Sequence, residues 1–373
     1  MCGAFVVKLS RSVAVAASAV VVVAGFYFCG HNKTFQNIII WNEKVDCADV
    51  MPVINSDVMQ RLKDIDQSGA ARYLGVKLPA FSRFEHSVGV YALLKKAGAL
   101  KKEQVAGLLH DASHTVFSHV GDYIWAKKIN DYNEESFQDT IHLAYLRKNK
   151  IEPVLKSLGM KLSDVDVEKN EYKALEQSLP DMCADRIQYN IHTGLIMKMI
   201  NEKDVKEILG DLKYKDGKWF FKNLVIARKF ANLSVYFTQN FWGSKWNTTM
   251  NIHFANALKR AIELKIISEN ELFSTDSVVL DKLLKSKDEV IKLNLQQCEK
   301  PLERISGQNY KSEKFYPKFR GIDPLIKQSS GKFVRLSEVD AMFRSNYDAV
   351  KKWCRDGFEV DILVPECMLG VAL

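Results

Sequence analysis

The chain has 373 residues, of which 47% are hydrophobic and 26% charged, a composition typical of globular proteins. It excludes a disordered chain, a collagen-like repeat and a small disulfide-stapled scaffold, and its few prolines (8) and glycines (19) favour helices. The net charge of +8 favours anionic partners such as nucleotides, nucleic acid or a membrane surface.

The N-terminal residues 1–30 have the pattern of a targeting segment. Lys8 and Arg11 precede an apolar run, residues 13–28, that would span about 24 Å as a helix, slightly less than the bilayer core. The run predicts a signal peptide or a short membrane anchor, with a buried helix of the fold as the alternative. We therefore expect a membrane-anchored or exported protein if residues 1–30 act as a signal, and a cytoplasmic one otherwise. The seven cysteines contain no C-x-x-C pair and indicate mostly reduced thiols.

Short strands are expected first, followed by helices. Apolar residues within 34–53 predict one or two strands, and helical periodicity begins near Ser56. A further helix is expected to begin at Ser82, because Ser82 and Glu85 have the spacing of a capping box, and to end at Gly98.

Two predicted helices carry polar residues at helical spacing. One is expected to run through His110, which would place His114 on the same face. The other is expected to begin after Pro180 and would align Asp181, Asp185 and Tyr189 at i, i+4 intervals.

The region beyond residue 205 is Lys-rich and aromatic, with a turn at Asp216-Gly217 and amphipathic helices at 255–267 and 277–291. Residues 306–319 are the best candidate for a linker in the C-terminal part of the chain. The predicted organisation is an N-terminal segment (1–30), a core (31–205) and a helical C-terminal region (206–373). Nucleic-acid binding is not favoured, since +8 is small for this length and the aromatic spacing suits a core. The sequence leaves open whether the protein forms a homo-oligomer.

Five of the eight histidines fall within residues 86–142. Imidazoles and carboxylates that converge from separate helices need neutralisation, and a divalent metal is the usual agent. A mixed nitrogen and oxygen site suits Mn, Fe, Co, Ni, Zn or Mg, and such an ion promotes phosphoester hydrolysis. Arg83 and Arg186 would then hold the phosphates of a substrate.

The order of His86, His110-Asp111 and Asp185 resembles the H…HD…D signature of the HD superfamily of metal-dependent phosphohydrolases. The segments 60–67, 83–90, 108–114, 117–119 and 184–186 are similar to its deoxynucleoside triphosphate triphosphohydrolase branch, the dGTPase and SAM-and-HD-domain proteins. The resemblance covers about residues 55–195.

This resemblance implies an all-α helical bundle, and the apolar pattern of residues 34–53 adds minor short strands near its start. It implies a metal held by His86, His110, Asp111 and Asp185. It also implies catalytic roles for Asp111, His114 and His119, phosphate contacts from Arg83, His114, His119 and Arg186, and sugar or base contacts from Gln67 and Tyr189.

The chain departs from the branch at several positions. Where the family has His-Glu, this chain has Gln138-Asp139. The other residues that could match this pair are Asn133-Glu134, which also lack the histidine. An amide cannot shuttle a proton as an imidazole does. Thr193 replaces a common aspartate, and Thr115-Val116 replaces Gly-Pro.

Two functions follow from these observations. The first is a metal-dependent phosphohydrolase, an ester-bond hydrolase that acts on a dNTP or another nucleotide phosphoester. The alternative is a catalytically impaired protein that binds a nucleotide or another ligand.

Overall fold

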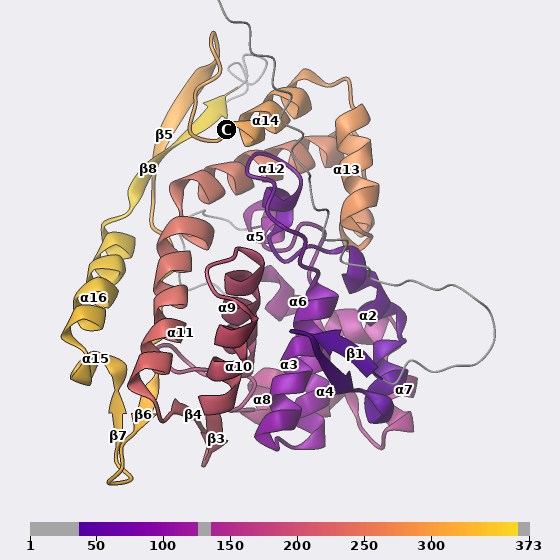
Figure 1. The fold of residues 1–373 in the computed structure, drawn as a ribbon. Helices are drawn as coiled ribbons and strands as arrows, with labels where there is room; N and C mark the ends of the chain where they lie inside the picture. The colour runs from indigo at the N-terminus through magenta and orange to yellow at the C-terminus, as the bar shows by residue number, and fades with distance from the viewer. Residues whose placement is uncertain (1–36, 126–135, 365–373) are drawn as a thin grey trace, which may run out of the picture. The chain divides into compact units, whose positions relative to one another are not determined.

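The computed structural model describes residues 37–125 and 136–364, and Figure 1 shows their helices and strands. The predicted signal or anchor segment, residues 1–30, and the pair Asn133-Glu134 lie outside the described residues. Within the described part of the chain, no helix is long and apolar enough to cross a bilayer.

The described chain opens with an antiparallel pair, β1 (Asn37–Ile40) and β2 (Glu43–Asp46), in which Ile38 lies opposite Val45. This pair confirms the strands predicted there. The short helices α1 (Met51–Ile54) and α2 (Asp57–Arg61) follow.

The central helix α3 (Arg83–Ala97) begins and ends where its sequence predicts. The Ser82 hydroxyl accepts from the Glu85 N–H, and the Glu85 carboxylate accepts from the Ser82 N–H, so both orphan donors of the first turn are satisfied. Gly98 ends the helix in the left-handed region, at φ 69°, which glycine adopts without a Cβ clash.

The helix α4 (Lys101–Leu109) is shorter than predicted. It ends at Leu109, and residues 110–119 form turns, so His110 and His114 do not share a helix face. Periodicity failed here because Ala112 and Val116 are buried in those turns as fully as helix residues are.

The helix α9 (Ala184–Ile196) likewise begins later than predicted. Cys183 is its N-cap, so Pro180 lies outside the first turn. Asp181 therefore does not share a face with Asp185, and it pairs with Arg335 instead at 2.6 Å.

The remaining helices complete a predominantly helical fold. Those before residue 212 are α5 (Val120–Trp125), α6 (Phe137–Lys148), α7 (Glu152–Ser157), α8 (Val167–Asn170) and α10 (Glu202–Asp211). Those after it are α11 (Leu224–Phe237), α12 (Lys245–Glu263), α13 (Asp276–Lys285), α14 (Glu289–Glu299), α15 (Leu336–Val339) and α16 (Ala341–Asp356).

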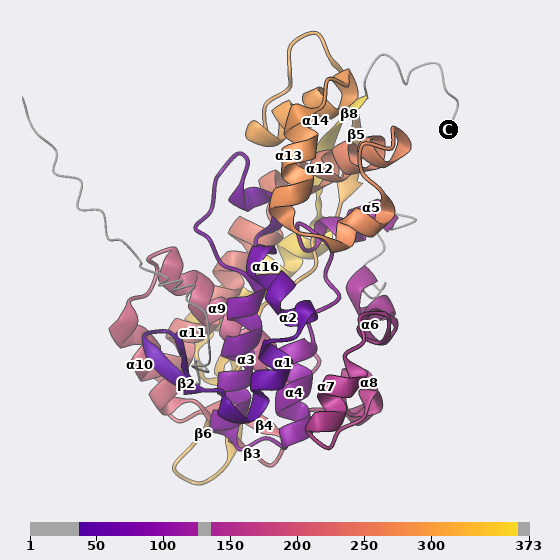
Figure 2. The same cartoon turned by 90° about the vertical axis from the view of Figure 1, so that its right-hand side faces the viewer.

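The packing brings distant parts of the chain together. The helix α3 packs on α4 and α9, α9 packs on α11, and α12 lies against α5 and α14, as both views show (Figures 1 and 2). One buried apolar cluster runs from Ile40 to Val350 and crosses residue 205 without interruption. The division at residue 205 stays a prediction.

The C-terminal region contains more strand than predicted. The hairpin β3 (Lys213–Lys215) and β4 (Lys218–Phe221) turns at Asp216-Gly217, as predicted, and is extended by β6 (Leu325–Lys327) and β7 (Phe333–Arg335). The segment predicted to be a linker contains β5 (Asn309–Phe315), which pairs with β8 (Phe358–Val364). Sequence patterns missed β5, β6 and β8 because each pairs with a strand far along the chain.

Candidate metal centre

Four side chains from three helical segments meet at one point. His86 comes from α3, His110 and Asp111 follow the end of α4, and Asp185 lies in the first turn of α9. The Nε2 atom of His86 lies 3.0 Å from Asp185 Oδ1, 3.2 Å from His110 Nε2 and 3.5 Å from Asp111 Oδ2. The Nε2 atom of His110 lies 3.5 Å from Asp111 Oδ1 and 3.6 Å from Asp185 Oδ1.

These spacings fit a divalent cation. Two ligands that bind at right angles with bonds of about 2.1 Å stand about 3 Å apart, which is close to the separations in the cluster. Two imidazoles and two carboxylates form a mixed donor set that suits first-row transition metals and Mg²⁺. His86, His110 and Asp111 therefore form a group that could hold a metal ion, and Asp185 lies beside both imidazoles.

The outer nitrogens of both imidazoles are held by hydrogen bonds. The Nδ1–H of His86 donates to Gln188 Oε1 at 2.5 Å, and the Nδ1–H of His110 donates to the Gly107 carbonyl at 2.8 Å. These bonds fix the tautomers that leave Nε2 free to bind a metal. Gly89 makes room for Gln188, since a Cβ there would lie 2.5 Å from the Gln188 amide nitrogen.

A buried arginine supports the carboxylate of Asp111. Arg83 donates from Nη1 to Asp111 Oδ2 at 2.5 Å and from Nε to the Ser118 hydroxyl at 2.7 Å. Burial raises the pKa of Asp111, but Arg83, His110 and His114 outweigh it and hold that pKa well below its usual range. Asp111 is thus ionised at neutral pH.

Two further histidines, His114 and His119, lie between the metal cluster and a cavity. His114 Nε2 lies 3.3 Å from Asp111 Oδ1, and its ring meets the His119 ring edge-on with centroids 5.0 Å apart. Burial, and then Arg83, lower the pKa of His114 to about 3, so this imidazole is neutral at pH 7. His119 is held by Asp122 at 3.0 Å and lines the cavity, whereas His114 does not.

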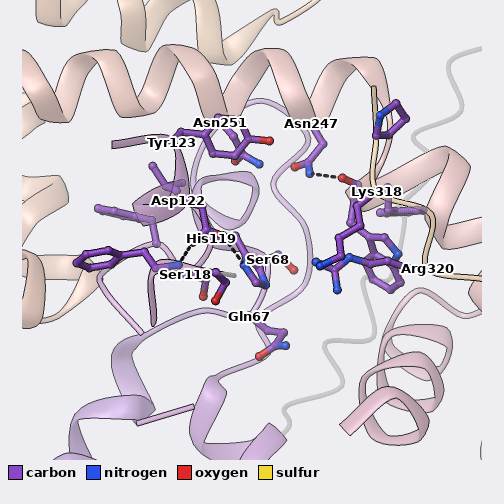
Figure 3. A pocket seen from close by; sticks show the side chains of 18 of the residues that line it. Gln67, Ser68, Ser118, His119, Asp122, Tyr123, Asn247, Asn251, Lys318 and Arg320 are labelled. Atoms are coloured by element: carbon purple, nitrogen blue, oxygen red, sulfur yellow. Dashed lines mark hydrogen bonds and ion pairs between the residues drawn. The ribbon is translucent and has the colours of Figure 1, made fainter. Parts of the chain in front are cut away.

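The cavity has a volume of about 440 Å³, within the range of small-molecule sites. Its aromatic walls come from Trp125, Phe137, Tyr189, Phe241, Trp242 and Trp246. In Figure 3, Gln67, Ser118 and His119 lie on one side, and Lys318 and Arg320 lie across the cavity from them.

Several polar atoms of the cavity walls are buried and find no hydrogen-bond partner among the described residues. They are Gln67 Oε1, Tyr189 Oη and Trp242 Nε1. Buried polar atoms are otherwise nearly always paired, so these mark a place where water or a ligand binds. Trp242 ends a single π-helical turn, Thr238–Trp242, a feature frequent at functional sites.

Family matches cover the cluster just described. The HD domain family matches residues 83–187, the range that contains all four converging ligands. The chain is 32% identical over 313 residues to the uncharacterized protein YdhJ of Bacillus subtilis strain 168, a match that covers 83% of this chain and 94% of YdhJ. It is 31% identical over 175 residues to the metal-dependent phosphohydrolase cns2 of Cordyceps militaris, covering 47% of this chain and 49% of cns2.

The chain belongs to the HD superfamily of metal-dependent phosphohydrolases. Its fold is similar to the crystal structure of a phosphohydrolase from Bacteroides thetaiotaomicron VPI-5482 (BT4208), with a TM-score of 0.61 and 16% identity over 87% of this chain and 98% of that one. The predictions of an HD superfamily member and of its helical fold are confirmed, and the triphosphohydrolase branch stays a prediction.

The two arginines predicted to hold phosphates are both bound to other residues of this HD protein. Arg83 binds Asp111 and Ser118, and neither arginine lines the cavity. Arg186 pairs with Glu176 at 2.5 Å and donates to the Gln177 carbonyl at 2.5 Å. Lys318 and Arg320 hold the basic positions at the cavity, and the sequence analysis did not single them out.

Gln138 is fixed by neighbours and does not line the cavity. The Ser113 hydroxyl lies 2.8 Å from Gln138 Oε1 and 2.9 Å from His142 Nδ1, so these three side chains form a buried group. Thr193, where an aspartate is common in the family, does line the cavity.

Proposed function

We propose that this protein hydrolyses a phosphoester of a nucleotide, with dNTP triphosphohydrolysis as the nearest activity. The observation that carries the proposal is the junction of a cation-sized cluster with an aromatic and basic cavity, joined by His114 and His119. A cavity that combines stacking surfaces with positive charge suits a planar base that carries phosphates.

Each part of the site has a role in this reaction. His86, His110, Asp111 and Asp185 would hold a divalent metal, and such an ion polarises a phosphoryl oxygen and lowers the pKa of bound water. Arg83 keeps Asp111 ionised and in position.

His119 is the candidate for proton transfer to the leaving oxygen. Its imidazole lines the cavity and is oriented by Asp122, in the arrangement that general acid–base catalysis requires. Gln138 has no such role in this scheme, because Ser113 holds it away from the cavity.

The base would be held between aromatic walls. Tyr189 and Trp242 meet edge to face with centroids 5.3 Å apart, and each keeps an unpaired polar atom among the described residues. Together with Gln67 Oε1, these atoms offer hydrogen bonds to the edge of a base or to a sugar hydroxyl.

A substrate panel tests the proposal. Purified protein with Mn²⁺ or Mg²⁺ is incubated with dNTPs, NTPs, guanosine tetra- and pentaphosphate and cyclic nucleotides, and the products are separated by chromatography. We expect release of phosphate, pyrophosphate or triphosphate from at least one nucleotide, with a loss of about 100-fold or more in Asp185→Ala as the control against contaminating phosphatases.

Silence across the panel, with metal demonstrably bound, contradicts the proposal and favours the ligand-binding alternative. A gain of activity in Gln138→His would then assign the defect to that position.

A further inference from the structure

The extended segment between β5 and β6 forms one wall of the cavity. Pro317, Lys318 and Arg320 all line it, and Figure 3 shows both basic side chains directed toward the cavity. The intervening Phe319 points away and packs edge-on against Tyr347 of α16, with ring centroids 5.0 Å apart.

This segment is held in place from three directions. Besides the contact of Phe319 with α16, the Ile322 N–H donates to the Ser234 hydroxyl of α11 at 2.9 Å, and the Asp323 N–H donates to the Pro180 carbonyl at 3.1 Å. Gly321 lets the Phe319 ring fold over it, since a Cβ there would lie 2.3 Å from the ring. The two basic residues are therefore presented by a fixed scaffold.

The two positive charges stand close together at the cavity wall. Lys318 is exposed and Arg320 is half-buried, and in the described part of the chain neither forms an ion pair. Partial desolvation, followed by the charge of Arg320, lowers the pKa of Lys318. Asp122 and Asp139 attract Lys318, but the carboxylate of Asp122 is bound to His119. Two like charges gathered in a cavity are stabilised by an anionic ligand, and phosphate oxygens accept from both side chains.

We infer that Lys318 and Arg320 bind a phosphate group other than the one at the metal cluster, so that the site selects ligands with two or more phosphates. This inference rests on the proposed function for the identity of the substrate. Lys318 and Arg320 line the cavity, whereas His86, His110, Asp111 and Asp185 are not among its lining residues. An anion bound between the two basic side chains would therefore lie in the cavity and not among the cluster residues.

Binding of inorganic triphosphate to the full chain tests this inference without requiring turnover. Isothermal titration would compare the wild type with Lys318→Gln, Arg320→Gln and the double variant. We expect each single change to raise the dissociation constant about tenfold and the double change by more. Lys332→Gln and Arg355→Gln remove exposed charges elsewhere and are expected to bind as the wild type does.

A second measurement avoids substitutions and so does not depend on the folding of variants. An amine-modifying reagent followed by mass spectrometry should show that triphosphate protects Lys318 but not Lys332. Unchanged affinity in the Lys318 and Arg320 variants, or equal modification of Lys318 with and without triphosphate, overturns the inference.

Kinetics separate this inference from the proposed function. If nucleotides are hydrolysed, the Arg320→Gln variant should raise KM for a nucleoside triphosphate more than for a monophosphate ester, and Arg320→Lys should recover part of the loss. Triphosphate binding through these residues without turnover of any nucleotide would contradict the proposed function and leave the inference standing.

Discussion

Gln188 is the residue on which the position of His86 depends. It is fully buried in α9, its Oε1 accepts from His86 Nδ1 at 2.5 Å, and no apolar side chain could replace that bond. Partners of this kind orient metal-binding imidazoles and raise their basicity.

The first prediction concerns the hydrogen bond between His86 and Gln188. Gln188→Leu keeps the volume but removes the acceptor, so metal affinity should fall about 10- to 100-fold while the fold is retained. Competition with a graded chelator measures the affinity, and Gln328→Leu on the exposed surface is the control. An unchanged affinity would show that Gln188 does not orient His86.

The second prediction contrasts two aspartates that the sequence placed on one helix face. Asp185 lies in the cluster, whereas Asp181 pairs with Arg335. Purified Asp185→Ala and His110→Ala should lose the bound divalent metal, and Asp181→Ala should keep it, as measured by elemental analysis of the intact protein. Equal metal content in all three proteins would refute the site.

The third prediction concerns His142, which lies buried beside Ser113. Burial, and then His110, lower its pKa to about 4, whereas an unfolded histidine titrates near 6.5. Below about pH 6.5 the unfolded state therefore binds a proton that the folded state does not, and stability falls as the pH decreases.

His142→Gln removes this titration. The free energy of unfolding of the wild type minus that of the variant should decrease between pH 7 and pH 5, by at most about 1.4 kcal/mol per pH unit. A difference that stays constant with pH would show that His142 is protonated as readily in the folded protein.

At the scale of elements, the first residue of α13 joins two loops of the site. Asp276 is fully buried and accepts from the Asp66 N–H at 2.9 Å, the Tyr73 hydroxyl at 3.0 Å and the Phe117 N–H at 2.6 Å. Phe117 and Ser118 both have positive φ, 58° and 57°, a costly conformation for side chains of this kind. The bonds of Asp276 help to hold the loop that carries His119.

The fourth prediction follows from this contact. Asp276→Ala leaves the buried N–H groups of Asp66 and Phe117 without their acceptor, which should cost about 3 kcal/mol of unfolding free energy. Asp281→Ala removes an exposed ion pair with Lys285 in the same helix. This variant should differ from the wild type by no more than about 0.5 kcal/mol in unfolding free energy. Denaturant unfolding measures both, and equal stabilities would exclude the structural role of Asp276.

At the scale of the whole molecule, we expect residues 1–30, which lie outside the described part of the chain, to determine location. The fifth prediction is that tagged full-length protein sediments with membranes or is cleaved near residue 30, and that a version beginning at residue 31 does neither. Recovery of the intact full-length chain in the soluble fraction would contradict a signal or anchor.

Features that depend on local chemistry could be predicted from the sequence alone. The capping box set the start of α3 because its two bonds join residues three apart, and the order of His86, His110, Asp111 and Asp185 indicated the superfamily. Composition and periodicity likewise predicted a helical fold.

Other features became visible only in the folded chain: the end of α4, the pairing of Arg186 with Glu176, and the place of Lys318 and Arg320 at the cavity. Each depends on contacts between segments that are far apart in the sequence. Periodicity and residue type do not tell which of those segments will pack against one another. The four cluster residues could be named from the resemblance to the HD superfamily, because their order along the chain carries it, whereas the walls of the cavity beside them were set by packing.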